Sequence, residues 1–181
     1  MIWFTADMHF DHEKVITLCK RPFVTVDEMN HVITDNILEF TDAGDTLYIN
    51  GDCGYSSGKI ETLLKFLKIQ GVQVHYIWGN HDKGSKMRRA IKDNVVWYGD
   101  MKHIKIEGQG LTICHYALRT WKGSHRGSWN LYAHSHDDLD DIGLQWDVGV
   151  DRNDFIPLSW DELKIRMAAK EQMFINHHGD N

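Results

Sequence analysis

The sequence predicts an α/β fold, with alternating strands and helices in its first half and short strands in its second. Three observations support this class. Apolar runs alternate with amphipathic stretches up to about residue 82, which is typical of strands joined by right-handed helical crossovers. Later apolar runs are short and separated by glycine-rich turns such as 107–110, a pattern that favours hairpins. A chain of 181 residues that is 42% hydrophobic can bury one core of ordinary size.

In the first half, apolar runs predict three buried strands, at 2–6, 46–50 and 72–78. A first helix at 13–20 ends before Pro22, because proline steers the preceding residue away from helical angles. A second helix, capped by Thr25 or Asp27, runs to about Phe40 with apolar residues at three- and four-residue steps. A third helix opens at 56–58 and ends at Gly71.

In the second half, apolar runs predict strands at 95–97, 101–107, 111–114, 131–133 and 144–150. The segment 119–128 is too polar and too rich in glycine for regular structure. A last helix begins at about Asp161. Ser159 and Glu162 match a capping box, in which the serine caps the helix and the glutamate side chain reaches back.

Composition argues against some functions and locations. A formal net charge of −6 disfavours a broad basic surface for nucleic acids. No apolar run approaches the roughly 18 residues that span a bilayer, and the N-terminus lacks the basic segment of a signal peptide. Three cysteines without CxxC spacing favour reduced thiols and a cytoplasmic location. We expect one domain at 1–176, a polar tail at 177–181, no membrane association and no obligate protein partner.

Five short polar clusters each follow an apolar run, where functional groups collect in α/β sheets. They are Asp7-Met8-His9, Gly51-Asp52, Gly79-Asn80-His81-Asp82, Cys114-His115 and His134-Ser135-His136. Together they offer carboxylate, amide and imidazole ligands, which suit Mn²⁺, Fe²⁺, Zn²⁺, Ni²⁺ or Co²⁺ better than Mg²⁺ or Ca²⁺. These ligands are too many for one tetrahedral zinc ion. Two metal ions that share a carboxylate would use them all.

Taken singly, most of these clusters have an ordinary structural interpretation. Asp7 suits a helix cap, Asp52 a turn and His115 a hydrogen-bonded core histidine, while 79–82 suits a plain turn. The pair His134 and His136 is ambiguous on its own. Their joint occurrence, in this order and at the ends of predicted strands, favours one shared site.

The ordered set resembles the calcineurin-like metallophosphoesterase superfamily over the span from the first strand to the last cluster. The matching motifs are D-x-H at 7–9, G-D at 51–52, G-N-H-D at 79–82, the lone His115 and H-x-H at 134–136. The chain is most similar to small bacterial and phage phosphoesterases, which share phrases like 21–23, 125–129 and 148–151. The resemblance implies a four-layer α-β-β-α sandwich of two mixed sheets flanked by helices.

The resemblance also implies roles for the motif residues. Asp7, His9 and His136 would hold one divalent ion, Asn80, His115 and His134 the other, and Asp52 would bridge both. Such a pair of ions activates a bridging hydroxide for in-line attack on phosphorus. His81 would protonate the leaving oxygen, or else only position other groups, and Asp82 would orient its imidazole.

Two departures from the family pattern bear on substrate. Ala133 replaces the glycine that usually precedes H-x-H, a small change unless the backbone there needs positive φ. Residues 53–55 lack the Asp-Arg-Gly of the protein phosphatases in this superfamily, so another group must contact the phosphate. Candidate substrate contacts are Arg119, His125 and Arg126 for phosphate oxygens and Trp121 for stacking. The alternative is a solvated surface loop.

We therefore expect a metal-dependent phosphodiesterase that acts on small or nucleotide-like substrates. One alternative is a phosphomonoesterase, or a nuclease that acts on nucleic-acid ends. An alternative of another class is a metal-free scaffold that binds a protein partner. A scaffold has no physical reason to gather so many groups that are costly to desolvate.

Overall fold

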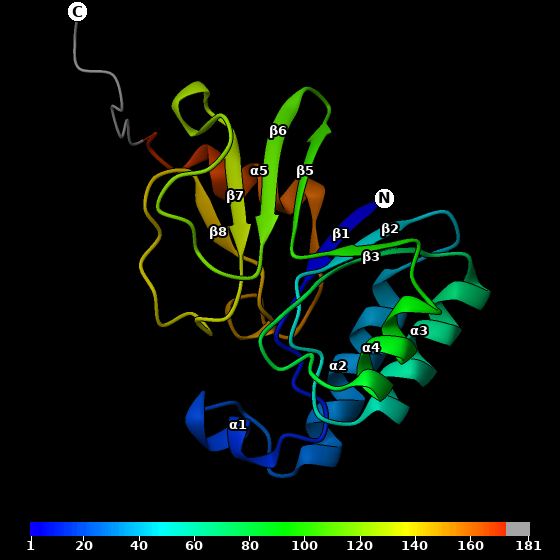
Figure 1. The fold of residues 1–181 in the computed structure, drawn as a ribbon. Helices are drawn as coiled ribbons and strands as arrows, with labels where there is room; N and C mark the ends of the chain where they lie inside the picture. The colour runs from blue at the N-terminus through cyan, green and yellow to red at the C-terminus, as the bar shows by residue number, and fades with distance from the viewer. Residues whose placement is uncertain (173–181) are drawn as a thin grey trace, which may run out of the picture.

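A computed structural model describes residues 1–172 of the chain. Two mixed sheets with flanking helices make up the fold (Figure 1), which confirms the predicted class. The expected polar tail at 177–181, and the domain boundary at 176, lie outside the described residues. No helix within residues 1–172 has the length and apolar character that crossing a membrane requires.

The first sheet has five strands in the order β4-β3-β2-β1-β9. Its strands are β1 (Ile2–Thr5), β2 (Thr46–Ile49), β3 (Gln73–Ile77), β4 (Trp97–Gly99) and β9 (Leu158–Ser159). The first four are parallel, and β9 runs antiparallel to β1 at the edge. The run 95–97 was expected among hairpins, but it leads into β4 beside β3. Helix α4 provides the connection that such a parallel pairing requires.

Four helices precede or join these strands: α1 (Glu13–Leu18), α2 (Val26–Phe40), α3 (Ser57–Gln70) and α4 (Ser85–Lys92). Figure 1 shows α2, α3 and α4 gathered on one side of β1–β3. Buried α2 residues such as Ile33 form a core with Leu47 and Val74 from the sheet. Thr25 caps α2 by accepting the Glu28 amide hydrogen at 3.1 Å, and Gly71, at φ 90°, ends α3.

The second sheet has four strands in the order β5-β6-β7-β8. They are β5 (Met101–Ile106), β6 (Gln109–Cys114), β7 (Trp129–Tyr132) and β8 (Gln145–Asp147). Only β5 and β6 form the expected hairpin, because β6, β7 and β8 are mutually parallel. Long loops return the chain to the same end of the sheet, and the first of them contains the short helix η1 (Ser124–Arg126). After β8 the chain forms η2 (Val150–Arg152), so the predicted strand at 144–150 is too long.

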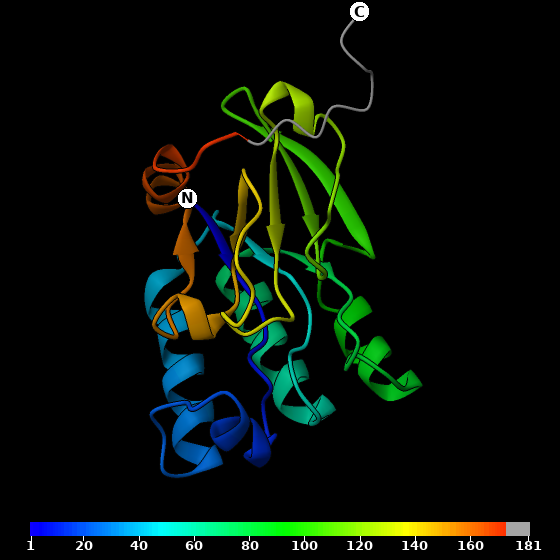
Figure 2. The same ribbon diagram turned by 90° about the vertical axis from the view of Figure 1, so that its left-hand side faces the viewer.

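A second core lies between the two sheets and includes Phe4 and Tyr48 from the first and Ile113 and Leu131 from the second. Helix α5 (Trp160–Ala168) contributes its buried face to this core, and Figure 2 shows it beside the N-terminal end of β1. Ser159 caps α5 as predicted by accepting the Glu162 amide hydrogen at 3.1 Å. The Glu162 carboxylate does not complete the box, because it accepts from Arg166 Nε at 2.9 Å instead.

Candidate functional site

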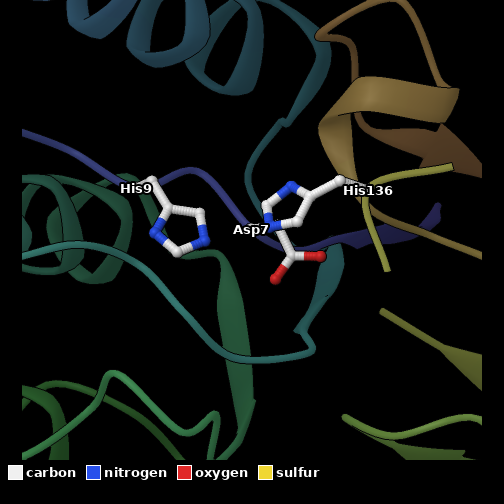
Figure 3. A group of neighbouring side chains, drawn as sticks. All are labelled: Asp7, His9 and His136. Atoms are coloured by element: carbon white, nitrogen blue, oxygen red, sulfur yellow. The ribbon is translucent and has the colours of Figure 1, made fainter. Parts of the chain in front are cut away.

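Two groups of potential metal ligands lie just beyond the carboxyl ends of the strands. The first donor group is Asp7, His9 and His136, whose ligand atoms all lie within 4.8 Å of one another. Asp7 and His9 follow β1, and His136 follows β7. Figure 3 shows the two imidazole rings and the carboxylate turned toward one another. Segments more than 120 residues apart thus meet through the hydrogen bond from the His134 amide to Asp7 Oδ2, at 2.7 Å.

The second donor group is Asp52, His115 and His134, also within 4.8 Å of one another. The Asn80 side chain joins this group, because its Oδ1 lies 3.0 Å from His115 Nε2. Asp52 Oδ2 lies 3.4 Å from His115 Nε2 and 3.8 Å from His9 Nε2. One carboxylate therefore faces both groups, and the fold brings all seven of the expected ligand residues together.

The loops that carry these residues adopt an unusual backbone conformation. Left-handed φ values occur at Asp7 (55°), His9 (52°), Asp52 (53°), His134 (72°) and His136 (49°). Few residues other than glycine occupy this region, and it persists where the surroundings enforce it, often at functional sites. Ala133 is not among the described residues with positive φ. The loss of glycine there therefore carries no backbone penalty.

Two glycines let the loops after β2 and β3 approach closely. A Cβ atom at Gly79 would lie 2.1 Å from Asp52 Oδ1 and 2.5 Å from the Asp52 amide nitrogen. A Cβ at Gly51, whose φ is 89°, would lie 2.6 Å from the Gly79 amide nitrogen and 2.8 Å from His115 Nδ1. Backbone packing this tight leaves no space for a side chain. The glycines in the G-D and G-N-H-D motifs thus set the spacing between Asp52 and the residues around it.

The first donor group contains buried polar atoms that need a partner. Asp7 Oδ1 and His9 Nε2 are buried and make no hydrogen bond among the described residues, a costly situation for polar groups. Burial raises the pKa of Asp7 to about 7 and lowers the pKa of His9 to about 3. Burial therefore keeps His9 neutral, with a lone pair available. A divalent cation would bind both atoms and favour the ionised carboxylate.

The second donor group is also suited to binding a divalent cation. His115 Nδ1 donates to the Asn50 carbonyl oxygen at 2.7 Å, which leaves Nε2 directed at Asn80 Oδ1 and Asp52 Oδ2. Burial acts to lower the pKa of His115, but the hydrogen bond and charge of Asp52 and the charge of Asp7 outweigh burial and raise it to about 9. Without a cation, a proton must sit between these acceptors. The geometry fits a metal ion in that place, since neutral imidazole and oxygen ligands converge there.

His81 and Asp82 have different surroundings. The His81 amide donates to Asp52 Oδ1 at 2.7 Å, and its half-buried ring lies 5.2 Å from the His9 ring between centroids. The buried Asp82 carboxylate accepts instead from the backbone amides of Gly79, Asp52 and Cys53, at 2.7, 3.1 and 3.3 Å. The expected contact with the His81 imidazole is absent from the hydrogen bonds of the described residues. Asp82 therefore holds the two loops together rather than orienting that ring.

The loop predicted to bind substrate runs away from the donor groups. Gln109, at the start of β6, donates to the Gly127 carbonyl oxygen at 2.8 Å, whereas His115 follows the opposite end of β6. Trp121, His125 and Arg126 therefore lie toward the far end of the second sheet, and Trp121 Nε1 donates to the Ser128 carbonyl oxygen at 2.9 Å. The loop that begins after His115 runs back along the second sheet, and the local sequence gives no sign of this direction. Arg119 is exposed.

Sequence reasoning missed several residues around the site. Arg21 is buried, the Asp151 side chain is 6% exposed, and both contact the first donor group. Only the shared phrases at 21–23 and 148–151 pointed to them. Asp147 accepts from Ser135 Oγ at 3.2 Å and from the Asp137 amide at 3.3 Å, which supports the H-x-H loop. Exposed Tyr55 and Tyr116 flank the site, with ring centroids 5.6 Å from His81 and 4.8 Å from His134.

A third set of donor atoms, on Cys19, His136 and Asp151, also lies within 4.8 Å. It shares His136 with the first donor group. The Asp151 oxygens are occupied by Arg21 and His136, and burial together with the charge of Asp151 raises the pKa of the Cys19 thiol to about 11. A protonated thiol is a poor metal ligand. We therefore assign the metal-binding chemistry to the first two groups.

Comparisons of sequence and structure relate this chain to known proteins. The family model described as calcineurin-like phosphoesterase matches residues 1–181. An uncharacterized protein of Methanocaldococcus jannaschii is 33% identical over 93 residues, which cover 51% of this chain. The match spans about half of that relative, 53% of its length.

Two solved structures are similar to this chain. A protein of unknown function from Aquifex aeolicus superposes with a TM-score of 0.71 and 24% identity, over 92% of this chain and 98% of its own. That likeness shows the fold alone. An archaeal phosphodiesterase covers 82% of this chain and 81% of its own, with a TM-score of 0.43 and 16% identity. That likeness is too weak to support an argument about the site.

Proposed function

We propose, on the premise that this chain belongs to the calcineurin-like phosphoesterase family, that it is a dinuclear metal-dependent phosphodiesterase for small or nucleotide-like substrates. The observation that carries this proposal is the position of Asp52, which belongs to the second donor group and also faces the first. Its Oδ2 lies within 4 Å of an imidazole nitrogen from each group, at 3.4 and 3.8 Å. A carboxylate shared by two divalent ions is a common basis for phosphoryl transfer at two-metal sites.

The residues present would hold two cations. Asp7, His9 and His136 would bind one ion, Asn80, His115 and His134 the other, and Asp52 both. Oxygen and imidazole ligands without a thiolate favour Mn²⁺, with Fe²⁺, Zn²⁺, Ni²⁺ and Co²⁺ as alternatives. When bound, the ions supply Lewis-acid stabilisation of charge on the phosphoryl oxygens and acidify water at the site.

The protein itself would orient the substrate and supply a proton. The His81 backbone is held against Asp52, while its half-buried ring extends between His9 and Tyr55, 5.2 and 5.6 Å from their ring centroids. We propose that this ring protonates the oxygen of the leaving alcohol. Asp82 acts indirectly, because its carboxylate joins the loops that carry Asp52 and His81.

Two features favour a diester over the phosphomonoester of a protein. A monoester dianion carries one more negative charge than a diester and gains more from an arginine clamp, but residues 53–55, directly after Asp52, contain no arginine. The exposed rings of Tyr55 and Tyr116 stand on two sides of the site, where each offers an apolar face to an ester group. Arg119, exposed beyond His115, is the proposed phosphate contact.

The decisive experiment measures hydrolysis after reconstitution of metal-free protein with Mn²⁺, and then with the other cations. Bis(p-nitrophenyl) phosphate and p-nitrophenyl phosphate provide a matched diester and monoester. We expect the diester to be hydrolysed with the higher kcat/KM. The double change Asp52→Ala and His81→Ala should lower kcat/KM by at least about 100-fold, because it removes a shared ligand and the proposed acid.

A matched control is the double change Asp35→Ala and His31→Ala, which removes the same residue types from an exposed part of α2. It should leave kcat/KM unchanged. Elemental analysis should find two ions in the wild-type protein and one after His136→Ala. Activity that survives the change at Asp52 and His81 would contradict the mechanism. Undetectable metal in the wild-type protein would favour the scaffold.

A further inference from the structure

Arg21 follows helix α1 and is fully enclosed, with 0% of its side chain exposed. Its guanidinium binds Asp151 in a bidentate manner, from Nε to Oδ1 at 2.7 Å and from Nη2 to Oδ2 at 2.8 Å. Nη2 also donates to the Asp7 carbonyl oxygen at 2.7 Å, and Nη1 donates to the Met8 carbonyl oxygen at 3.1 Å. One side chain therefore holds both the backbone of the D-x-H loop and the carboxylate of η2.

Asp151 connects this arginine to the first donor group. Its side chain is 6% exposed, and its Oδ2 accepts a hydrogen bond from His136 Nδ1 at 2.7 Å. A carboxylate paired with arginine is ionised and acts only as an acceptor, so Nδ1 must carry the hydrogen. The lone pair of the His136 ring is then on Nε2, the nitrogen left to face Asp7 and His9.

Resting on the proposed function, we infer that Arg21 and Asp151 are positioning residues that fix the tautomer and orientation of His136 as a metal ligand. Neither residue belongs to the two donor groups. A carboxylate that accepts from the second nitrogen of a ligating histidine raises the basicity of that ligand and holds its ring. Arg21 holds Asp151 in place for this role. Because its guanidinium also binds the Asp7 carbonyl oxygen, it links the loop of Asp7, through Asp151, to His136.

Burying an ion pair is itself costly, and replacement by apolar residues is often neutral or stabilising. Stability alone therefore gives little reason for a buried arginine and carboxylate here. The pair joins four segments that are distant in sequence, around positions 7, 21, 136 and 151. Two of these segments, around positions 7 and 136, carry the first donor group. In the second donor group, the His115 ring is held instead by the Asn50 carbonyl oxygen. The effect should therefore be selective for one ion.

The test titrates metal-free protein with Mn²⁺ by calorimetry and compares wild type with Asp151→Asn and Arg21→Lys. Asparagine keeps the shape and an acceptor oxygen but loses the charge, and lysine keeps the charge but loses the bidentate fork. We expect Asp151→Asn to weaken the binding of one of the two ions by about 10- to 100-fold, and Arg21→Lys by less. Affinity for the other ion should change little.

A control for the loss of a buried carboxylate is Asp45→Asn. The Asp45 side chain is 8% exposed and accepts from Trp3 Nε1 at 2.8 Å, at the opposite end of the strands from the site. This variant should lose stability in urea but bind both ions like wild type. Wild-type affinity for both ions in Asp151→Asn would overturn the inference, as would an equal loss at both sites. Failure of the wild-type protein to bind any ion would instead overturn the proposed function, and the inference with it.

Discussion

The parallel strands and the loops that follow them differ in side-chain packing and in backbone conformation. Across the first sheet, Phe4, Tyr48, His75 and Trp97 are successive register partners, and their rings lie 5.4, 4.9 and 6.4 Å apart between centroids. This aromatic row uses ordinary extended backbone. The loops that follow β1, β2 and β7 instead contain left-handed backbone at five candidate ligands.

This difference suggests that the strands stabilise the fold and that the loops after them serve the candidate site. Rows of packed side chains across a sheet generate stability. Strained backbone reduces stability and remains where the surrounding structure enforces it. Changes in the strands should therefore alter the free energy of unfolding without altering metal binding per folded molecule. Changes in the loops should alter metal binding or activity per folded molecule more than they alter the free energy of unfolding.

The largest effect should come from the aromatic row. Phe4 is completely buried between the two sheets, so Phe4→Ala removes its packing and leaves a cavity. We expect a loss of about 3–5 kcal/mol in the free energy of unfolding, measured by urea titration of metal-free protein. Phe66→Ala, the same change at a ring on α3 that is 53% exposed, should cost much less. Equal costs for the two variants would show that the row does not stabilise the fold.

The next largest effect should come from the loop after β3. Gly79→Ala would place a methyl group 2.1 Å from Asp52 Oδ1, so one loop must move. Displacement of about 1 Å at a catalytic site can cost about 100-fold in rate, and we expect at least that loss in kcat/KM for the diester. Gly58→Ala in α3, where the nearest neighbouring atom is 3.9 Å away, is the control. A Gly79→Ala protein with full activity would contradict the close approach of these loops.

Sequence patterns predicted the strand bodies well because local periodicity encodes them. The alternation of apolar runs predicted β1, β2 and β3, and the capping side chains of Thr25, Ser56 and Ser159 mark real helix starts. Pairing between distant segments has no local signal. The parallel arrangement of β6, β7 and β8, and the place of β4 in the first sheet, therefore appeared only in the structure.

The same limit applies to the site. Residues with recognisable chemistry at strand ends could be gathered from the sequence into one candidate centre, because parallel strands end at a common edge. Local sequence patterns did not assign Arg21 and Asp151 to this centre. An arginine before a proline, or an aspartate after a short apolar run, has no distinctive local pattern. The destination of the loop 119–128 also depends on backbone contacts such as Gln109 with Gly127, which sequence proximity to His115 did not indicate.

The smallest effect should be the pH dependence contributed by the aromatic row. His75 is half-buried in the row between Tyr48 and Trp97. Burial, reinforced by the charge of Lys102, lowers the pKa of its ring to about 4 from an ordinary value near 6.5. Between these pH values, the unfolded chain binds a proton that the folded protein does not. The contribution of His75 to stability is therefore complete above pH 6.5 and is lost as the pH falls toward 4.

The variant His75→Phe isolates this contribution, because phenylalanine keeps the row and cannot titrate. The free energy of unfolding of wild type minus that of the variant should be constant above pH 7 and should decrease from pH 6.5 to 4. Other titrating groups, including Asp7 and His9, are common to both proteins and cancel in the difference. The change should be modest, since partial contact with water screens the charge of the ring. A difference that does not vary with pH would contradict this prediction. It would show that packing in the row does not lower the pKa of His75.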